Sequence, residues 1–195
     1  MIAHGSIVFM GAAPTRGPLD YRKRQKGYET MQKHLYLIGG TMGVGKTTVS
    51  QILKKKLDRA VFLDGDWCWD ADPFIVTDET KEMVLDNITH LLQGFLRCSA
   101  YQNVIFCWVM HEQSIIDDIL RRLDLADCTV HAISLICTEE ALKTRLYRDI
   151  DAGIRKEDIV SRSVSRLPLY RKLNTVKIEV SDLLPHEVAD RISVL

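Results

Sequence analysis

The chain has 195 residues, of which 46% are hydrophobic, and this length and apolar content suit a single domain with a sizeable core. Basic and acidic residues balance at 26 each, and beyond residue 33 the acidic residues are in excess, which disfavours a nucleic-acid partner. No apolar stretch reaches the roughly 18 residues that a membrane span requires. The five cysteines are scattered, with no Cys-x-x-Cys pair and no Cys/His metal spacing, and this usage is typical of free thiols in a reducing, cytoplasmic compartment.

Residues 1–33 differ from the rest of the chain. Six of them are basic and two are acidic, glycines and prolines interrupt them, and no helical stripe runs through them. We therefore expect a disordered, dispensable N-terminal extension, with Met31 resembling a natural start for a domain at 34–195. A basic arm that touches a partner is the alternative for this segment.

The run GTMGVGKTT at residues 40–48 fits the phosphate-loop template G-x-x-x-x-G-K-[ST]. An apolar run at 35–38 predicts a buried strand before it, and apolar residues at helical spacing, from Val49 to Leu57, predict a helix after it. This strand–loop–helix context favours a phosphate site over an ordinary glycine-rich turn. The run therefore predicts that the chain binds a nucleoside triphosphate.

The phosphate loop offers three kinds of group to a triphosphate. Its glycines and the following helix N-terminus direct backbone N–H groups at an anion, Lys46 adds a mobile positive charge, and the Thr47 hydroxyl completes a Mg²⁺ shell. The residues expected to bind the nucleotide are Gly40, Thr41, Met42, Gly43, Val44, Gly45, Lys46, Thr47 and Thr48.

Asp64 and Asp66 follow a second predicted strand at 60–63. Continued as a strand, this segment would present both carboxylates on one face, at the edge where open α/β sheets bind ligands. A carboxylate there holds a Mg²⁺-bound water or accepts the proton of an attacking hydroxyl, whereas the alternative is an Asx-type turn. We assign Asp64 to the metal and Asp66 to the acceptor hydroxyl as base, although the two roles are interchangeable at this stage.

Aromatic side chains cluster directly after these aspartates. Trp67, Trp69 and Phe74 either stack on a planar acceptor or shield the sheet edge. His111 follows a third predicted strand and is either an acceptor contact or a helix-entry residue. Trp67, Trp69 and His111 are thus candidate substrate-binding residues, together with Asp66.

Later segments continue the alternation of helices and strands. The pattern predicts a helix capped by Thr77, a strand at 103–108, a helix to about residue 123 opened by a capping box of Ser114 and Asp117, a strand at 129–137, a helix capped by Thr138, a helix over 155–167 ended by Pro168, a strand at 175–180 and a helix starting at Pro185. Strands separated by helices predict an α/β fold with a mostly parallel sheet covered on both faces.

Basic residues gather in the last third of the chain. Arg145 and Arg148 are three apart on a predicted helix, so they share a face and suit the charge that builds on a transferring phosphoryl group. Arg155, Arg162 and Arg166 belong either to a mobile cover or to a solvated surface.

Together these residues resemble the P-loop small-molecule and nucleotide kinases, and the overall likeness is to bacterial proteins described as AAA-type ATPases or nucleotide kinases. The resemblance rests on GTMGVGKTT at 40–48, LDGD at 63–66, RLYR at 145–148 and a closing pattern from Ser181 to Val188, so it spans essentially residues 34–195. LDGD is similar to a motif of adenylylsulfate kinases, and Asp-x-Asp at this place also occurs in shikimate-kinase-like enzymes.

The resemblance implies a three-layer sandwich with five parallel strands in the order 2-3-1-4-5, and it implies ATP and Mg²⁺ as cofactors. It also implies acceptor binding after strand two and an arginine-bearing lid after strand four. Arg145 and Arg148 then match lid arginines, and Asp64 and Asp66 match the metal and substrate carboxylates. The residues after Asp66 and the end of strand three match no acceptor motif of these families.

We therefore expect an ATP-dependent phosphotransferase acting on a hydroxyl or phosphate of a small metabolite or nucleotide, as a monomer or homodimer, with Lys46, Asp66, Arg145 and Arg148 as catalytic residues. The alternative is a P-loop ATPase or regulatory nucleotide switch without a small-molecule acceptor. No N-K-x-D motif supports a GTPase, and the strand at 103–108 lacks the final acidic residue of motor ATPases, although Asp64 would fill that role.

Overall fold

A computed structural model describes residues 32–195 of the chain. The predicted N-terminal extension therefore lies outside the described residues, apart from its last two. Lys33 is the first residue of the first strand, and Gln32 Nε2 donates a hydrogen bond to Thr129 Oγ1 at 3.0 Å. The domain thus includes residues 32 and 33 as well as the predicted 34–195.

Five parallel strands form one sheet in the order β2-β3-β1-β4-β5, which confirms the predicted fold class and strand order. The strands are β1 (Lys33–Gly39), β2 (Ala60–Asp64), β3 (Asn103–Trp108), β4 (Cys128–Ile136) and β5 (Val176–Glu179). The helices are α1 (Lys46–Lys56), α2 (Asp78–Arg97), α3 (Gln113–Arg121), α4 (Glu139–Asp151), α5 (Asp158–Arg171), α6 (Pro185–Ile192) and the short 3-10 helix η2 (Gly65–Cys68).

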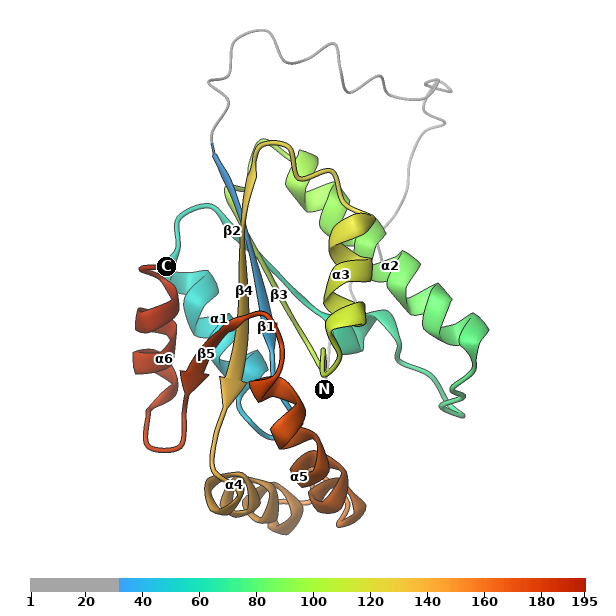
Figure 1. Cartoon of the computed structure of the whole chain (residues 1–195), viewed down its shortest axis with the longest axis vertical. Coiled ribbons are helices and arrows are strands. Elements are labelled where there is room, and N and C mark those ends of the chain that lie inside the picture. Colours follow the sequence, from blue (N-terminus) through green and yellow to red (C-terminus); the bar gives the residue numbers. More distant parts are fainter. Residues whose placement is uncertain (1–31) are drawn as a thin grey trace, which may run out of the picture. The chain divides into compact units, whose positions relative to one another are not determined.

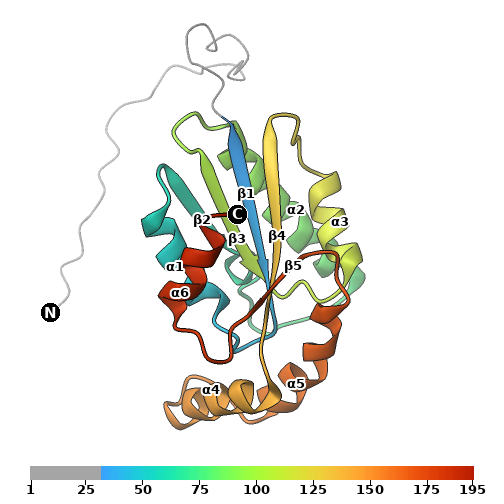
Figure 2. The same cartoon turned by 60° about the vertical axis from the view of Figure 1, so that its left-hand side comes forward.

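Helices cover both faces of the sheet and complete a three-layer sandwich (Figures 1 and 2). Successive residues of a strand point to opposite faces, so Ile38 and Leu37 of β1 enter two different cores. Ile38 packs with Leu53 of α1 and Ile192 of α6, whereas Leu37 packs with Ile88 of α2. Burial on both faces explains why the strands read as continuous apolar runs.

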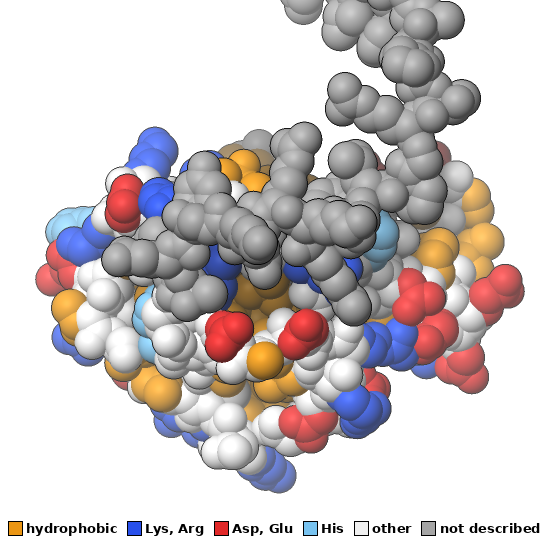
Figure 3. All heavy atoms as spheres, turned by 90° about the horizontal axis from the view of Figure 1, so that it is seen from above, with side chains coloured by type: hydrophobic (Ala, Val, Ile, Leu, Met, Phe, Trp, Pro, Cys, Tyr) orange, Lys and Arg blue, Asp and Glu red, His pale blue; other side chains and the backbone are white. Residues whose placement is uncertain are grey.

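All five strands run toward the same end of the sheet, and α4 and α5 lie beyond that end (Figure 1). The loops that follow the strands therefore meet beside these two helices. At the opposite end, where the strands begin, the visible Lys and Arg side chains lie among Asp and Glu side chains (Figure 3). None of the helices within residues 32–195 is long and apolar enough to cross a membrane.

Two predicted helix caps are confirmed. Thr77 caps α2, where its Oγ1 accepts a hydrogen bond from the Thr80 N–H at 3.2 Å, and Thr138 caps α4 by accepting from the Ala141 N–H at 3.2 Å. Each of these caps satisfies an N–H group that has no partner within the helix.

The predicted capping box of Ser114 and Asp117 is wrong. Helix α3 begins two residues earlier, at Gln113, and its N-cap Glu112 makes no side-chain cap bond. Gln113 Nε2 instead donates to Asp117 Oδ1 at 2.9 Å. The carboxylate that the box requires is therefore engaged by a neighbour on the helix itself.

The predicted end of a helix at Pro168 is also wrong, because α5 runs through this residue to Arg171. Pro168 removes one helical N–H donor and is itself exposed. Two residues later, Tyr170 is fully buried, and Leu173 is buried as well. Burial of these two side chains favours continuing the last turn onto the sheet. The start of the helix also differs, since it lies at Asp158 rather than at residue 155.

Candidate active site

The phosphate loop joins β1 to α1, and its backbone departs from ordinary strand and helix geometry at glycines. Gly43 has φ of 81° and Gly45 has φ of 105°, values that L side chains rarely adopt. Gly45 is the N-cap of α1; no side chain caps this helix, and its first turn contains no acidic residue. The uncapped N–H groups and the positive end of the helix dipole are therefore left for an anion.

Lys46 lies at the centre of the site. Its Nζ donates to the Thr41 carbonyl at 3.1 Å. Burial lowers the pKa of Lys46, and the nearby Arg155 guanidinium also lowers it, while Asp64 and Asp66 act in the opposite direction. The two predicted carboxylates and Lys46 therefore lie within electrostatic range of one another.

Asp64 ends β2 and is buried, with 5% of its surface exposed. Its Oδ2 accepts a hydrogen bond from Thr47 Oγ1 at 2.7 Å, which joins the two residues that were predicted to hold a metal. Its Oδ1 accepts from the Asp66 N–H at 3.1 Å and so fixes the start of η2. Asp66 consequently lies in η2 rather than in the strand, which corrects the expectation that a continuous strand presents both carboxylates.

Within residues 32–195, no group of three or more His, Cys, Asp or Glu side chains gathers to hold a metal ion. The donors that do meet are the Thr47 hydroxyl and the Asp64 carboxylate. Hard oxygen donors of this kind fit Mg²⁺, which keeps several waters and takes further oxygens from phosphates. The pair therefore suits a Mg²⁺ ion that arrives with a nucleotide.

Asp66 differs from Asp64 in its exposure, because it lies on the surface of the site. Partial burial raises the pKa of Asp66, the charge of Asp64 raises it further, and Lys46 together with a hydrogen bond from Trp108 lowers it. A carboxylate with a raised pKa is a stronger base than an ordinary aspartate, and the role of Asp66 as a base stays a prediction.

Two residues at the end of β3 also belong to the site, although the sequence analysis gave them no role. The strand register places Cys107 opposite Asp64, and Cys107 Sγ donates to Asp64 Oδ2 at 3.4 Å. Burial, followed by the charge of Asp64, raises the pKa of Cys107 to about 12, so the thiol stays neutral. Trp108 packs on Gly65, where an added Cβ would lie 2.5 Å from the indole Cγ. The glycine between two aspartates was the sequence signal for this contact.

Arg145 and Arg148 have different surroundings in the structure. The half-buried Arg145 guanidinium donates to the backbone carbonyls of Val44, Val180 and Ser181, and thus connects the phosphate loop to the end of β5. Arg148 is exposed on α4. The predicted pair therefore shares a helix but not a common environment, and Arg145 already has three carbonyl partners.

The sequence allows Arg155 either a role in a mobile cover or a place on the solvated surface. In the structure its charge lies near the site. It affects the pKa of both Lys46 and Asp66, while its Nε donates to Asp149 Oδ2 at 3.0 Å. Arg155 lies between α4 and α5, so this cation is carried by the short linker beyond the end of the sheet. Among the arginines in the last third of the chain, Arg155 is therefore the strongest candidate for a lid residue.

The predicted acceptor residues differ in their surroundings. Trp67 is 61% exposed and makes an edge contact with Phe62 at a centroid distance of 5.4 Å, whereas Trp69 is half-buried against Phe74 at 4.6 Å. His111 pairs with Glu112 at 3.4 Å between Nε2 and Oε1, and its buried Nδ1 has no hydrogen-bond partner among the described residues. No hydrogen bond in this part of the chain joins His111 to the two aspartates.

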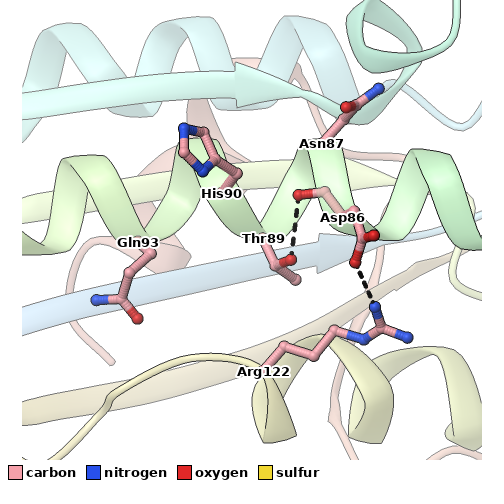
Figure 4. Close-up of a pocket in the computed structure, with 6 residues that line it drawn as sticks. All are labelled: Asp86, Asn87, Thr89, His90, Gln93 and Arg122. Atoms are coloured by element: carbon pink, nitrogen blue, oxygen red, sulfur yellow. Dashed lines mark hydrogen bonds and ion pairs between the residues drawn. The ribbon is translucent and has the colours of Figure 1, made fainter.

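A shallow hollow of about 490 Å³ lies on α2 beside the end of α3 (Figure 4). Its lining is polar, and the Arg122 guanidinium points to Asp86, with a distance of 2.7 Å between Nη1 and Oδ1. None of the residues predicted for nucleotide, metal or acceptor lines it. The residues that do are Asp86, Asn87, Thr89, His90, Gln93 and Arg122.

Comparison with known proteins agrees with this geometry. The profile of the AAA domain family matches residues 37–163, a stretch that contains the phosphate loop, both aspartates and α4. No curated protein matches the sequence.

Solved structures share the fold. The tunicamycin resistance protein of Deinococcus radiodurans superimposes with a TM-score of 0.64 at 20% identity, over 83% of this chain and 94% of that chain. The shikimate kinase of Acinetobacter baumannii in complex with shikimate gives 0.56 at 25%, over 85% and 92%. The APS kinase of Mycobacterium tuberculosis in complex with AMPPNP and APS gives 0.60 at 14%, over 84% and 97%. The chain thus has the kinase-like P-loop fold.

Proposed function

The chain belongs to the AAA domain family. We propose that it is an ATP-dependent phosphotransferase that acts on a hydroxyl or phosphate group of a small molecule. The observation that carries the proposal is the arrangement of Lys46, the Thr47–Asp64 pair and Asp66 around one uncapped helix N-terminus. Structural neighbours that bind shikimate or APS support a small-molecule acceptor.

In this mechanism the backbone N–H groups of the phosphate loop and Lys46 bind the β- and γ-phosphates of ATP. Thr47 and Asp64 would hold Mg²⁺, which supplies charge neutralisation across these phosphates when bound. The Asp66 carboxylate accepts the proton of an acceptor hydroxyl as its oxygen bonds to the γ-phosphorus and the bond to ADP breaks. Because the pKa of Asp66 is raised, this proton transfer is more favourable than to an ordinary aspartate.

Arg145 takes a positioning role in this proposal. Its contacts with the Val44, Val180 and Ser181 carbonyls hold the phosphate loop against the segment after β5, beside the place where a nucleotide would bind. Arg155 provides the cation that approaches the transferring group. We also place the enzyme in the cytoplasm, because all five of its cysteines are free thiols.

The test is a screen for ADP release from MgATP over a library of hydroxyl and phosphate compounds. Lys46→Ala is the blank, and Lys55→Ala, an exposed lysine on the same helix, is the matched control. We expect at least one compound to stimulate ADP release in the wild type and the Lys55 variant. The Lys46 variant should lose about 100-fold or more, as when one preorganised electrostatic group is removed from an active site.

Asp66→Asn separates binding from chemistry. We expect it to bind MgATP with wild-type affinity in calorimetry and to lose acceptor phosphorylation. Folded protein that takes up neither ATP nor GTP with magnesium would refute the proposal. ATP hydrolysis that a protein partner stimulates, and that no small molecule changes, would identify a regulatory ATPase instead.

A further inference from the structure

The surface next to Asp66 combines exposed aromatic and aliphatic side chains with acidic residues. The segment from residue 60 to residue 80 contains no Lys, Arg or His. It contains six acidic residues, of which Asp64 is buried and Asp66 is the proposed base. We define the acceptor surface as Asp66, Trp67, Asp70, Phe74, Ile75 and Val76.

The apolar members of the acceptor surface are all more than half exposed. Trp67 is 61% exposed, Phe74 58%, Ile75 55% and Val76 56%. They fall on η2 and on the segment that leads to α2, and this segment projects away from the sheet in Figure 1. Phe74, Ile75 and Val76 are consecutive in the chain, and exposed apolar side chains that adjoin one another are typical of a binding surface.

The acceptor surface is anchored to the catalytic residues. Asp64 Oδ1 fixes the Asp66 N–H, the Trp69 N–H donates to the Asp66 carbonyl at 3.3 Å, and Asn87 Nδ2 of α2 donates to the Cys68 carbonyl at 3.3 Å. Trp67 follows the proposed base in the chain and lies on the same short helix, which is held at both ends.

Cations near this surface are already paired. Lys81 binds Asp78 at 3.1 Å, and Arg122 binds both Glu82 at 2.8 Å and Asp86 at 2.7 Å. The cations of the phosphate loop and of the α4–α5 linker, Lys46 and Arg155, act on Asp66, and we assign them to the phosphates of the nucleotide. The acceptor surface thus offers carboxylates and aromatic rings, which repel an anion and attract a neutral ring or a cation.

We propose that the acceptor is a neutral or cationic hydroxyl compound with an apolar, flat ring, and that anionic metabolites are poor substrates. This inference rests on the proposed function and adds the substrate class. The hydroxyl of such a compound would meet Asp66, while its ring stacks on Trp67 and any positive charge lies toward Asp70.

Three probes that share the same phenol ring but differ in charge test the inference. At neutral pH tyramine is a cation, tyrosol is neutral and 4-hydroxyphenylacetate is an anion. Binding is measured by calorimetry with the Lys46→Ala protein as well as the wild type, so that the result does not depend on turnover. We expect tyramine and tyrosol to bind at least about tenfold more tightly than the anion, because all three stack through the same ring and only the carboxylate of the anion is repelled by the negative charge of the surface.

Variants assign the effect to the surface. Trp67→Ala should weaken tyramine binding by about tenfold, Trp67→Phe should restore most of it, and Tyr147→Ala, which removes an exposed ring from α4, should leave it unchanged. Asp70→Asn should reduce the preference for tyramine over tyrosol.

Several results would overturn the inference. These are equal or tighter binding of the anion, no binding of any probe by protein that binds MgATP, or a screen whose only substrates are anions. A dimer that dissociates on Trp67→Ala would assign the surface to a second copy of the chain. Protein that fails to bind MgATP would count against the proposed function instead, and the two failures are therefore distinct.

Discussion

Replacement of Gly43 by alanine tests the contact between the phosphate loop and α4. Gly43 occupies a variable position of the loop template, yet its Cβ would overlap Leu146 Cδ2 and lie 3.0 Å from Leu146 Cγ. Leu146 is fully buried, so a shift of its side chain would disturb its neighbours in the core. Overpacking of this kind costs about 1–3 kcal/mol, and the left-handed φ of 81° adds about 1–2 kcal/mol for a side chain.

Gly153→Ala is the matched control, because Gly153 has a similar φ of 72° but nothing within 4 Å of its Cβ position. We expect the Gly153 variant to lose about 1–2 kcal/mol of unfolding free energy and the Gly43 variant about 1–3 kcal/mol more. Urea unfolding, extrapolated linearly to water, measures both values. Equal losses in the two variants would show that Leu146 does not restrict the loop.

A double-mutant cycle with Leu146→Ala sharpens this test. Removing the Leu146 methyl groups is itself destabilising, by about 2–5 kcal/mol, since it leaves a cavity in the core. If the overlap is the cause, Gly43→Ala costs less in this background than in the wild type, with a coupling of about 1–3 kcal/mol. Additive effects would contradict the contact as the source of the loss.

Three other changes test the site. Asp64→Asn removes the charge paired with Thr47, and we expect the Mg²⁺ requirement of turnover to rise about 10- to 100-fold, measured by Mg²⁺ titration at fixed ATP; an unchanged requirement would exclude this metal role. The pKa of Asp66 in the folded protein is raised above the unfolded value of 3.8. The stability that this shift contributes is fully present below pH 3.8 and is lost as the pH rises through the folded pKa. Asp66→Asn should therefore stabilise the protein more at pH 7 than at pH 4.5 in urea unfolding, and an equal gain at both pH values would contradict the shift. Arg145→Lys keeps the charge but not the three carbonyl contacts and should cost about 1–3 kcal/mol, whereas Arg148→Lys, at an exposed position, should cost less than about 0.5 kcal/mol; similar losses would count against Arg145 as an anchor.

The sheet and the nucleotide end of the site were open to prediction because local sequence determines them. Apolar runs such as 35–38 and 103–108 have no periodic polar residue, as strands buried on both faces require, and Asn103–Trp108 was predicted with its observed bounds. The spacing of Gly40, Gly45, Lys46 and Thr47 specifies a strand–loop–helix unit by itself. The meeting of Thr47 with Asp64 followed from parallel strands that end at one edge.

The features that were missed depend on residues distant in the chain. The carbonyl partners of Arg145 come from residues 44, 180 and 181, and Cys107 meets Asp64 through strand register, so neither contact leaves a local pattern. Pro168 misled because its neighbours Tyr170 and Leu173 are buried by tertiary packing, which outweighs one lost hydrogen bond. The roles of Asp64, Asp66 and His111 stay predictions.

Thr41 is fully buried and its hydroxyl donates to the Ser163 carbonyl of α5 at 2.8 Å. With Leu146 of α4 against Gly43, both helices beyond the sheet are fastened to the phosphate loop itself. A rigid-body movement of the two helices away from the sheet would therefore break the Thr41–Ser163 hydrogen bond and the packing of Leu146 on the phosphate loop. If the proposed function holds, the segment between these helices, which includes Arg155, is the part of the cover that such contacts leave to close on a bound nucleotide.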